Sequence, residues 1–322
     1  MSFTNIPVLQ PGGSPAPLLK YNRQYILEIT GPQIPEPLEI KLPFTIEFDI
    51  ERNNYSSVNR GTIKIYNLSL QHRNQIIHDQ WDNADTSPQT LYITLQAGYG
   101  AGPNYPIILK GNATRAFSYR QGVNFITQID VFDGGLAYDN AVSSHSFAAG
   151  TQISQVIDAL VSDLTSVAPY GLSKGAVSNI VGNLSKGNTY TGSTISLLTE
   201  LSNANFYIDN GTVNLVLASD AIGGNDVVIS SQSGILGTPV KQSQWLTVEL
   251  LFEPRLTVGS LINLQSIGVK DTNSGGYYYN GPHKVAAVSH RGIISPAVSG
   301  EAVTSLSLLA GTFNAISTSS NQ

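Results

Sequence analysis

Residues 44–51, Phe-Thr-Ile-Glu-Phe-Asp-Ile-Glu, alternate strictly between large apolar side chains and polar or acidic ones. This period of two is typical of a β-strand with one buried face and one wet face. The alternation returns at 61–66 after a polar turn and stops at Asn67, Leu68 and Ser69. Beyond that point the spacing of Ile76 and Ile77 predicts a short helix. The pattern therefore predicts a sheet with one polar face.

The polar positions of the first strand include Glu47, Asp49 and Glu51, which form an acidic row on one face. Taken from these residues alone, the row is a plain solvated surface. The family resemblance described below adds a second interpretation of this acidic face.

Length and composition limit the class of protein. A chain of 322 residues exceeds the size at which one core keeps growing, so two or more domains are expected. Cysteine is absent, which excludes disulfides, thiol nucleophiles and thiolate metal sites. Only 12% of the residues are charged, against about 25% in a typical domain. This balance is common in β-rich structural proteins and suits permanent subunit contacts.

Charge and hydropathy exclude two kinds of partner. The net charge of -5 argues against a nucleic-acid-binding protein, which needs a basic stripe to displace counterions from phosphates. The start of the chain lacks the features of a signal peptide, and no apolar run approaches the roughly 18 residues of a membrane span. We therefore expect a protein that is kept in the cytoplasm, or in a particle assembled there, without a membrane partner.

The pattern along the chain predicts a first β domain. Residues 1–23 hold four prolines and paired glycines and should form an extended arm. Residues 24–146 should form a β-sandwich or barrel with one helix. Its strand patterns cover 25–29, 38–51, 62–68, 91–96, 107–119 and 125–132.

A helical rhythm then predicts a small α+β insertion domain over 147–222. Apolar residues between 153 and 164 follow helical spacing behind Thr151, which can cap the first turn. A second helix should start at Ser193. Asn210 and Gly211 between two apolar runs predict a hairpin with a two-residue turn.

Short strand patterns return over 223–311 and predict a second β domain, while 312–322 should be a flexible tail. The expected fold class is thus mainly β, α+β overall: two β-sandwich or barrel domains with a small α+β insertion between them.

No catalytic or metal-binding constellation emerges. No two histidines have the i, i+4 spacing that presents two ligands to one metal. Asp79, Asp82 and Asp85 lack the spacing and closing Glu of a calcium loop, and 182–187 lacks the ending of a phosphate-binding loop. Neither a Gly-x-Ser-x-Gly elbow nor a defined pair of carboxylates occurs. We expect a non-enzymatic protein without cofactor or metal.

Two segments carry a family resemblance. The first is the strand end Ile63, Ile65, Tyr66, Asn67, Leu68, Ser69 before a short helix. The second combines 250–259, containing Leu-Phe-Glu-Pro-Arg-Leu-Thr-Val-Gly, with the tyrosines at 277–279 and the strand pattern 285–292 that includes His290. In this order they resemble the baseplate hub proteins of long-tailed bacteriophages, a family that includes the late control protein D group.

The resemblance implies two tail-tube-like β domains per subunit. It implies a homotrimer that joins the hexameric tail tube protein to a central spike protein, contacts other baseplate proteins and lets DNA pass in transit. The subunit would belong to the virion, in a baseplate assembled in the host cytoplasm. Under this reading Glu47, Asp49 and Glu51 are candidate lumen-lining residues, because like charge keeps DNA from sticking. Candidate subunit-interface residues are Asn67, Leu68, Tyr277 and Tyr279.

Three alternatives stay open at this stage. A tail-tube or tube-initiator subunit would be a hexamer, although its single β domain fits poorly with this length. A glycan-binding adhesin would use exposed aromatics such as Tyr277 and Tyr279, and packing of an edge strand explains these rings equally well. A hydrolase is the weakest alternative, because cysteine is missing and histidine is scarce.

Overall fold

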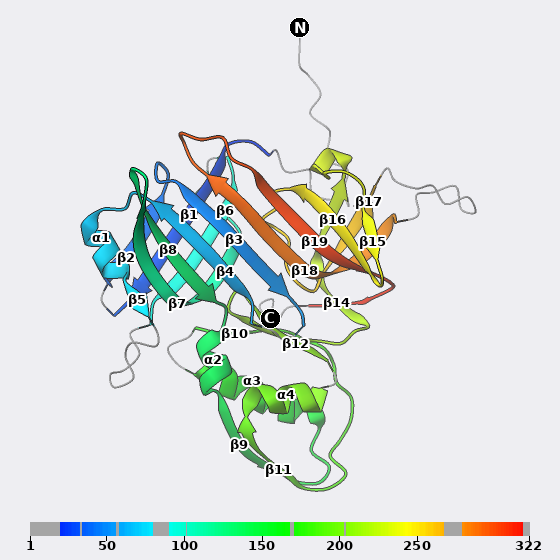
Figure 1. Cartoon of the computed structure of the whole chain (residues 1–322). Coiled ribbons are helices and arrows are strands. Elements are labelled where there is room, and N and C mark those ends of the chain that lie inside the picture. Colours follow the sequence, from blue (N-terminus) through cyan, green and yellow to red (C-terminus); the bar gives the residue numbers. More distant parts are fainter. Residues whose placement is uncertain are drawn as a thin grey trace.

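The computed structural model describes residues 20–32, 34–55, 58–79, 90–100, 102–167, 171–202, 204–266 and 279–317. Within these residues the chain is mainly β, as the sequence predicts. It has three parts, which in chain order are the first β part (23–132), the central part (135–216) and the second β part (220–316) (Figure 1).

The first β part opens with the strands that the alternating pattern predicts. The predicted strand 38–51 is divided into two strands by a turn at 42–45. The elements are β1 (Arg23–Gly31), β2 (Ile34–Lys41), β3 (Ile46–Asn53), β4 (Arg60–Tyr66), α1 (Leu70–Ile76), β5 (His78–Asp79), β6 (Tyr92–Tyr99), β7 (Ile107–Gln121) and β8 (Asn124–Phe132).

The central part contains the helices and the small hairpin expected between the β segments. Helix α3 forms as predicted, but Thr151 does not cap it: the Thr151 hydroxyl donates to Ala148 O, and Gln152 occupies the cap position without a side-chain bond. The elements are α2 (Gly135–Asn140), β9 (Val142–Phe147), α3 (Ile153–Ser166), β10 (Ser173–Val177), β11 (Asn188–Ser193), α4 (Thr194–Ser202), β12 (Asn205–Asp209) and β13 (Thr212–Val216).

The second β part completes the fold. It includes a strand where the sequence predicts the start of a flexible tail, because Asn314 bonds to Ser219 and Asp220. The elements are β14 (Asp220–Ser230), the 3-10 helix η1 (Ser231–Ser233), β15 (Val240–Gln242), β16 (Trp245–Leu251), β17 (Ser260–Gln265), β18 (Gly281–Ile294), β19 (Ala302–Ala310) and β20 (Asn314–Ile316).

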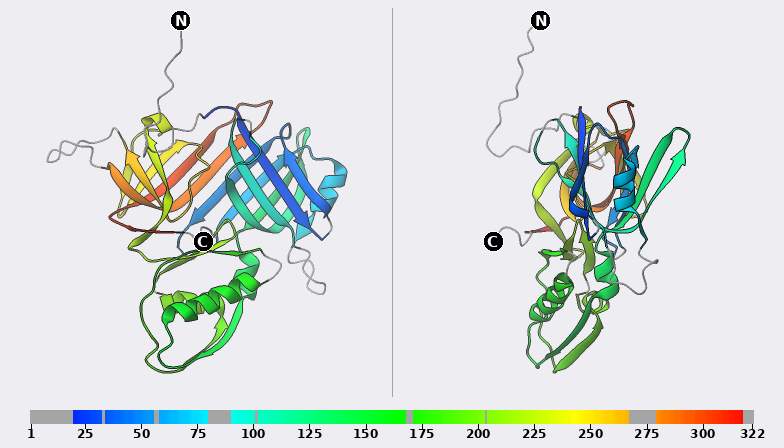
Figure 2. Two further views of the ribbon diagram at one scale, coloured as in Figure 1. Left: turned by 180° about the vertical axis from the view of Figure 1, so that it is seen from behind. Right: turned by 90° about the vertical axis from the view of Figure 1, so that its left-hand side faces the viewer.

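A single sheet runs through both β parts. Among the described residues it has 15 strands, and its main path is β15-β16-β19-β18-β3-β4-β8-β7-β6-β1-β2. The two β parts therefore lie side by side, and the central part hangs below them in Figure 1 and in both views of Figure 2.

Strand β18 joins the two β parts. Its first residues, 281–284, pair with β17, whereas 287–294 pair with β3 on the same edge. Its other edge pairs with β19 along most of its length. One long strand thus belongs to both parts, so neither β part ends in a free edge where they meet.

Three clusters of buried apolar residues form the core. The first is built from β1 to β8 and also receives Phe252, Ile294 and Ala302 from the second β part. The second is built from the second β part and receives Ala176, Tyr207 and Val216 from the central part. The third belongs to the central part. The first and second clusters thus each include side chains from a neighbouring part.

A buried polar cluster connects the three parts around Arg52, which is 1% exposed. Its guanidinium donates to Asp209 of β12 (3.0 and 3.3 Å) and to Leu256 O (2.8 Å). Nη2 also lies 3.2 Å from Nε2 of His290 on β18. Burial, with the nearby Arg52 charge, holds the pKa of His290 well below its usual value, so the ring is neutral and accepts from Arg52. Its Nδ1 then donates to Thr304 Oγ1 (2.9 Å).

Residues 67–69, between β4 and α1, have a local structural role. Asn67 has a positive φ of 60°, and its side chain accepts from Phe125 N (3.0 Å) and donates to Asn124 Oδ1 (3.0 Å). Leu68, 3% exposed, enters the first core, and the Ser69 hydroxyl accepts from His72 N to cap α1. The three residues therefore turn the chain, anchor it in the core and start the helix.

We expect Asn67→Ala to lower the free energy of unfolding by about 1–2 kcal/mol, because alanine tolerates the left-handed conformation poorly and cannot replace the two bonds. Asn67→Gly removes the same bonds but relieves the backbone, so it should be the milder change. Urea unfolding of both variants measures the difference. Equal losses would show that the backbone conformation contributes nothing.

The buried pair of Arg52 and Asp209 should be far more costly to break than an exposed pair on the same strand. Asp209→Asn leaves a buried guanidinium without its carboxylate and should cost about 3–5 kcal/mol. The control is Glu51→Gln, which breaks the exposed pair with Arg60, whose side chains are 55% and 66% exposed; it should cost less than about 1 kcal/mol. Similar losses in urea unfolding would contradict this account of the cluster.

Candidate functional site

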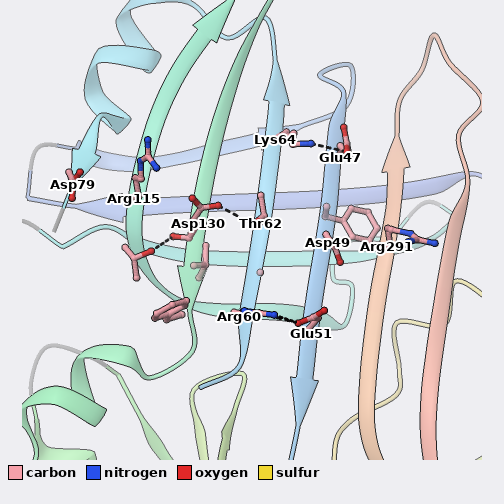
Figure 3. A pocket seen from close by; sticks show the side chains of 15 residues that line it. Glu47, Asp49, Glu51, Arg60, Thr62, Lys64, Asp79, Arg115, Asp130 and Arg291 are labelled. Atoms are coloured by element: carbon pink, nitrogen blue, oxygen red, sulfur yellow. Dashed lines mark hydrogen bonds and ion pairs between the residues drawn. The ribbon is translucent and has the colours of Figure 1, made fainter. Parts of the chain in front are cut away.

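The outward face of β3, β4 and β8 forms an open groove of about 750 Å³ (Figure 3). The alternation of β3 puts Ile46, Phe48 and Ile50 in the core, so the residues between them face the groove. Charged side chains contribute most of its polar lining: Glu47, Asp49, Glu51, Arg60, Lys64, Asp79, Arg115, Asp130 and Arg291.

The three acids predicted from the sequence do lie on this one face, but cations lie beside them. Lys64 Nζ donates to Glu47 Oε1 (3.0 Å), and Arg60 Nη2 donates to Glu51 Oε2 (2.7 Å). In the strand register, Asp49 stands opposite Arg291 of β18. The acidic row of β3 is therefore flanked by basic side chains from its two neighbouring strands.

Further contacts fix this arrangement. The Tyr66 hydroxyl donates to the second oxygen of Glu47 (3.1 Å), and the Thr62 hydroxyl donates to Asp130 Oδ1 (2.9 Å). The hydrogen bond to Glu47 raises the pKa of Lys64, which keeps this ammonium charged. Burial, followed by the bond to Glu47, raises the pKa of the Tyr66 hydroxyl, which therefore remains a donor.

The groove is nearly neutral as a whole. Its lining holds five carboxylates and four cations. Partly exposed pairs of this kind add little stability, but they leave only one carboxylate in excess. The face is therefore polar and charge-compensated: the predicted acidic row is present, but the cations beside it keep the face from carrying one sign of charge. The missing signal was in the next strand, where Lys64 and Arg60 occupy the positions that face Glu47 and Glu51 across a hairpin.

The candidate interface residues have different positions. Asn67 and Leu68 serve the internal turn described above, and Leu68 offers almost no surface to a neighbour. Tyr279 is half-buried and packs against the second core. Tyr277 lies outside the described residues. The structure thus brings Asn67 and Leu68 together but places Tyr279 in the other β part.

The described residues contain no group of three or more His, Asp or Glu side chains arranged to hold a metal ion. Within the same residues, every helix is too short or too polar to cross a membrane.

Comparison with known protein families gives the family. A model described as baseplate hub gp41 matches residues 27–277, which is more than half of the chain. The chain belongs to this baseplate hub family. It is therefore a bacteriophage tail protein of the structural kind, as its sequence patterns indicated. No curated protein sequence matches the chain.

Solved structures with a similar fold are also tail proteins or their relatives. The prophage MuSo2 43 kDa tail protein from Shewanella oneidensis has a TM-score of 0.53 at 9% identity, over 88% of this chain and 96% of that one. The tail protein from Neisseria meningitidis MC58 has a TM-score of 0.55 at 9% identity, over 90% and 97%.

A third neighbour is the E. coli c3393 protein, described as a component of the type VI secretion system with structural similarity to the T4 bacteriophage tail proteins gp27 and gp5. Its TM-score is 0.52 at 8% identity, over 89% of this chain and 78% of that one. At these identities the three likenesses show the fold alone.

Proposed function

We propose that this hub-family chain forms a trimeric ring that joins the hexameric tail tube to the central spike and lets DNA pass during infection. The observation that supports the ring is the one sheet shared by two β parts. If each part is a tube-like unit, three chains present six such units to the tube above and three-fold symmetry to the spike below. Residues 147–222, which make up most of the central part, are then the proposed insertion domain, and residues 1–23 are the proposed arm.

The proposed partners are the chain itself, the tail tube protein, the spike protein and other baseplate proteins. The proposed location is the virion baseplate, after assembly in the host cytoplasm. Permanent ring contacts of this kind bury roughly 2,000–5,000 Å². Tyr279 and Tyr277 remain the proposed contact residues, whereas the internal bonds of Asn67 and the burial of Leu68 weigh against a contact there.

We propose further that the groove face lines the passage. A surface that DNA crosses must not hold phosphates, and binding of phosphates requires uncompensated Lys or Arg. The role of Glu47 and Glu51 would then be to compensate Lys64 and Arg60, which project from the same face. This differs from simple repulsion: the acids mask cations, and the net charge of the face stays near zero.

The oligomeric proposal is tested by the native mass of the purified chain, alone and mixed with lysate that contains candidate spike proteins. A particle three times the mass of the 34.4 kDa chain is expected. A hexamer would contradict the trimeric ring and favour the role of a tube subunit. A chain that stays monomeric in both samples would contradict the ring.

The passage proposal is tested by charge reversal in assembled particles. Replacing Glu47, Asp49 and Glu51 with Lys leaves two carboxylates among seven cations in the groove, so DNA release should slow, and added salt should restore it. The matched control exchanges partners, as Glu47→Lys with Lys64→Glu and Glu51→Arg with Arg60→Glu, and keeps the total charge. Normal assembly with unchanged release kinetics in the triple variant would remove this face from the passage.

A further inference from the structure

The β12–β13 hairpin docks the central part against both β parts. Its turn at Asn210 and Gly211 has the positive φ angles that the sequence predicts. Gly134 also has a positive φ and lies so close to Ile208 that a Cβ would come within 2.5 Å of that side chain. Several polar contacts tie the hairpin to the β parts. They include Arg52 to Asp209, Asn59 Nδ2 to Ile208 O (2.7 Å), Asn210 Nδ2 to Ile107 O (2.9 Å), Gly211 N to Asp133 Oδ1 (2.9 Å), Val258 N to Asp209 Oδ2 (3.3 Å) and the Tyr207 hydroxyl to Val258 O (3.2 Å).

Two carboxyl groups lie where the hairpin docks, and the single guanidinium there forms an ion pair with only one of them. Asp209 is paired with Arg52. Asp133, 1% exposed, accepts from the Gly211 amide through Oδ1, while its Oδ2 is buried and has no hydrogen-bond partner among the described residues. An ionised carboxylate with an unbonded buried oxygen is strongly disfavoured.

The groups around Asp133 reinforce this conclusion. Burial raises its pKa to about 8, and the charge of Asp209 adds to the shift. The amides of the turn and Arg52 act in the opposite direction without outweighing burial. Tyr138 of α2 and Lys110 of β7 are further titratable neighbours: Tyr138 interacts with the charge of Asp133, and Lys110 lines the same small cavity. Near neutral pH the side chain is therefore a neutral acid.

We propose that Asp133 is a proton-controlled latch for the central part, closed when this side chain is neutral and loosened when it becomes a carboxylate. Loss of the proton puts a second buried negative charge beside Asp209 with a single guanidinium for both. The least unfavourable way to stabilise the new charge is to hydrate it, which requires the β12–β13 turn to move away from Asp133. The central part would then move relative to a sheet that remains intact.

The sign of the pH dependence follows from the direction of the shift. The folded pKa of Asp133 lies above the unfolded value, so its contribution to stability is complete below the unfolded pKa, near 4, and is lost as pH rises towards 8. His290 acts in the other direction, because its pKa is lowered and its contribution is lost only in acid. Lys284, with a pKa lowered to about 8 by burial, titrates in the same range but lies in the second β part.

Because the chain has no cysteine, two can be introduced for spin labels without further changes. Val181 in the central part is 86% exposed, and Val240 in the second β part is 51% exposed. The labelled full-length chain carrying Val181→Cys and Val240→Cys is compared at pH 6 and pH 9.5 in three backgrounds. These are the unchanged chain, Asp133→Asn, and the control Asp139→Asn, which removes an exposed carboxyl from the same segment.

The latch predicts a distance distribution that is narrow at pH 6 and broad at pH 9.5 in the unchanged chain and in Asp139→Asn, but narrow at both values in Asp133→Asn. An unchanged distribution in the unchanged chain would overturn the proposal. So would equal broadening in Asp133→Asn, because Lys284 or another group would then be the cause.

A second measurement does not depend on the folding of a variant. The Gly211 amide donates to Asp133, so its NMR signal in the unchanged chain should titrate with a midpoint of about 8. A signal that does not move between pH 6 and pH 10 would also overturn the latch.

Discussion

The arrangement of the three parts depends on one buried guanidinium. Arg52 finds its carboxylate on β12, a carbonyl at Leu256 and a neutral ring at His290, and these three groups come from distant segments of the chain. Removing one partner of a buried charge is strongly destabilising. Docking of the central part and pairing of β18 with β3 are therefore coupled, and an incomplete arrangement would leave a charge in the core.

That coupling has a consequence for the exposed face. When β18 pairs with β3, Arg291 stands opposite Asp49, just as Lys64 and Arg60 meet Glu47 and Glu51 from the other side. The same register that buries His290 thus completes the charge compensation of the groove. The near neutrality of this face is thus set by the backbone register, which places the charged side chains opposite one another.

The strands were predictable because their period of two is local, and so was the family, through the Tyr-Asn-Leu-Ser end of β4. The shared sheet was not, because no local pattern says that β3 pairs with a strand about 240 residues later. The acidic row was predicted without its cations because they depend on register. The sequence did indicate the buried position of Arg52. This residue continues the alternation of Ile46, Phe48 and Ile50, so its charged side chain should point into the fold.

The most direct measurement is an electron cryo-microscopy reconstruction of the assembled tail tip that contains this chain. We expect a three-fold ring between tube and spike, with two β parts per subunit around the channel and Glu47, Lys64, Glu51 and Arg60 facing it. A six-fold ring of this chain, or a three-fold ring in which this face points outward to solvent, would contradict it.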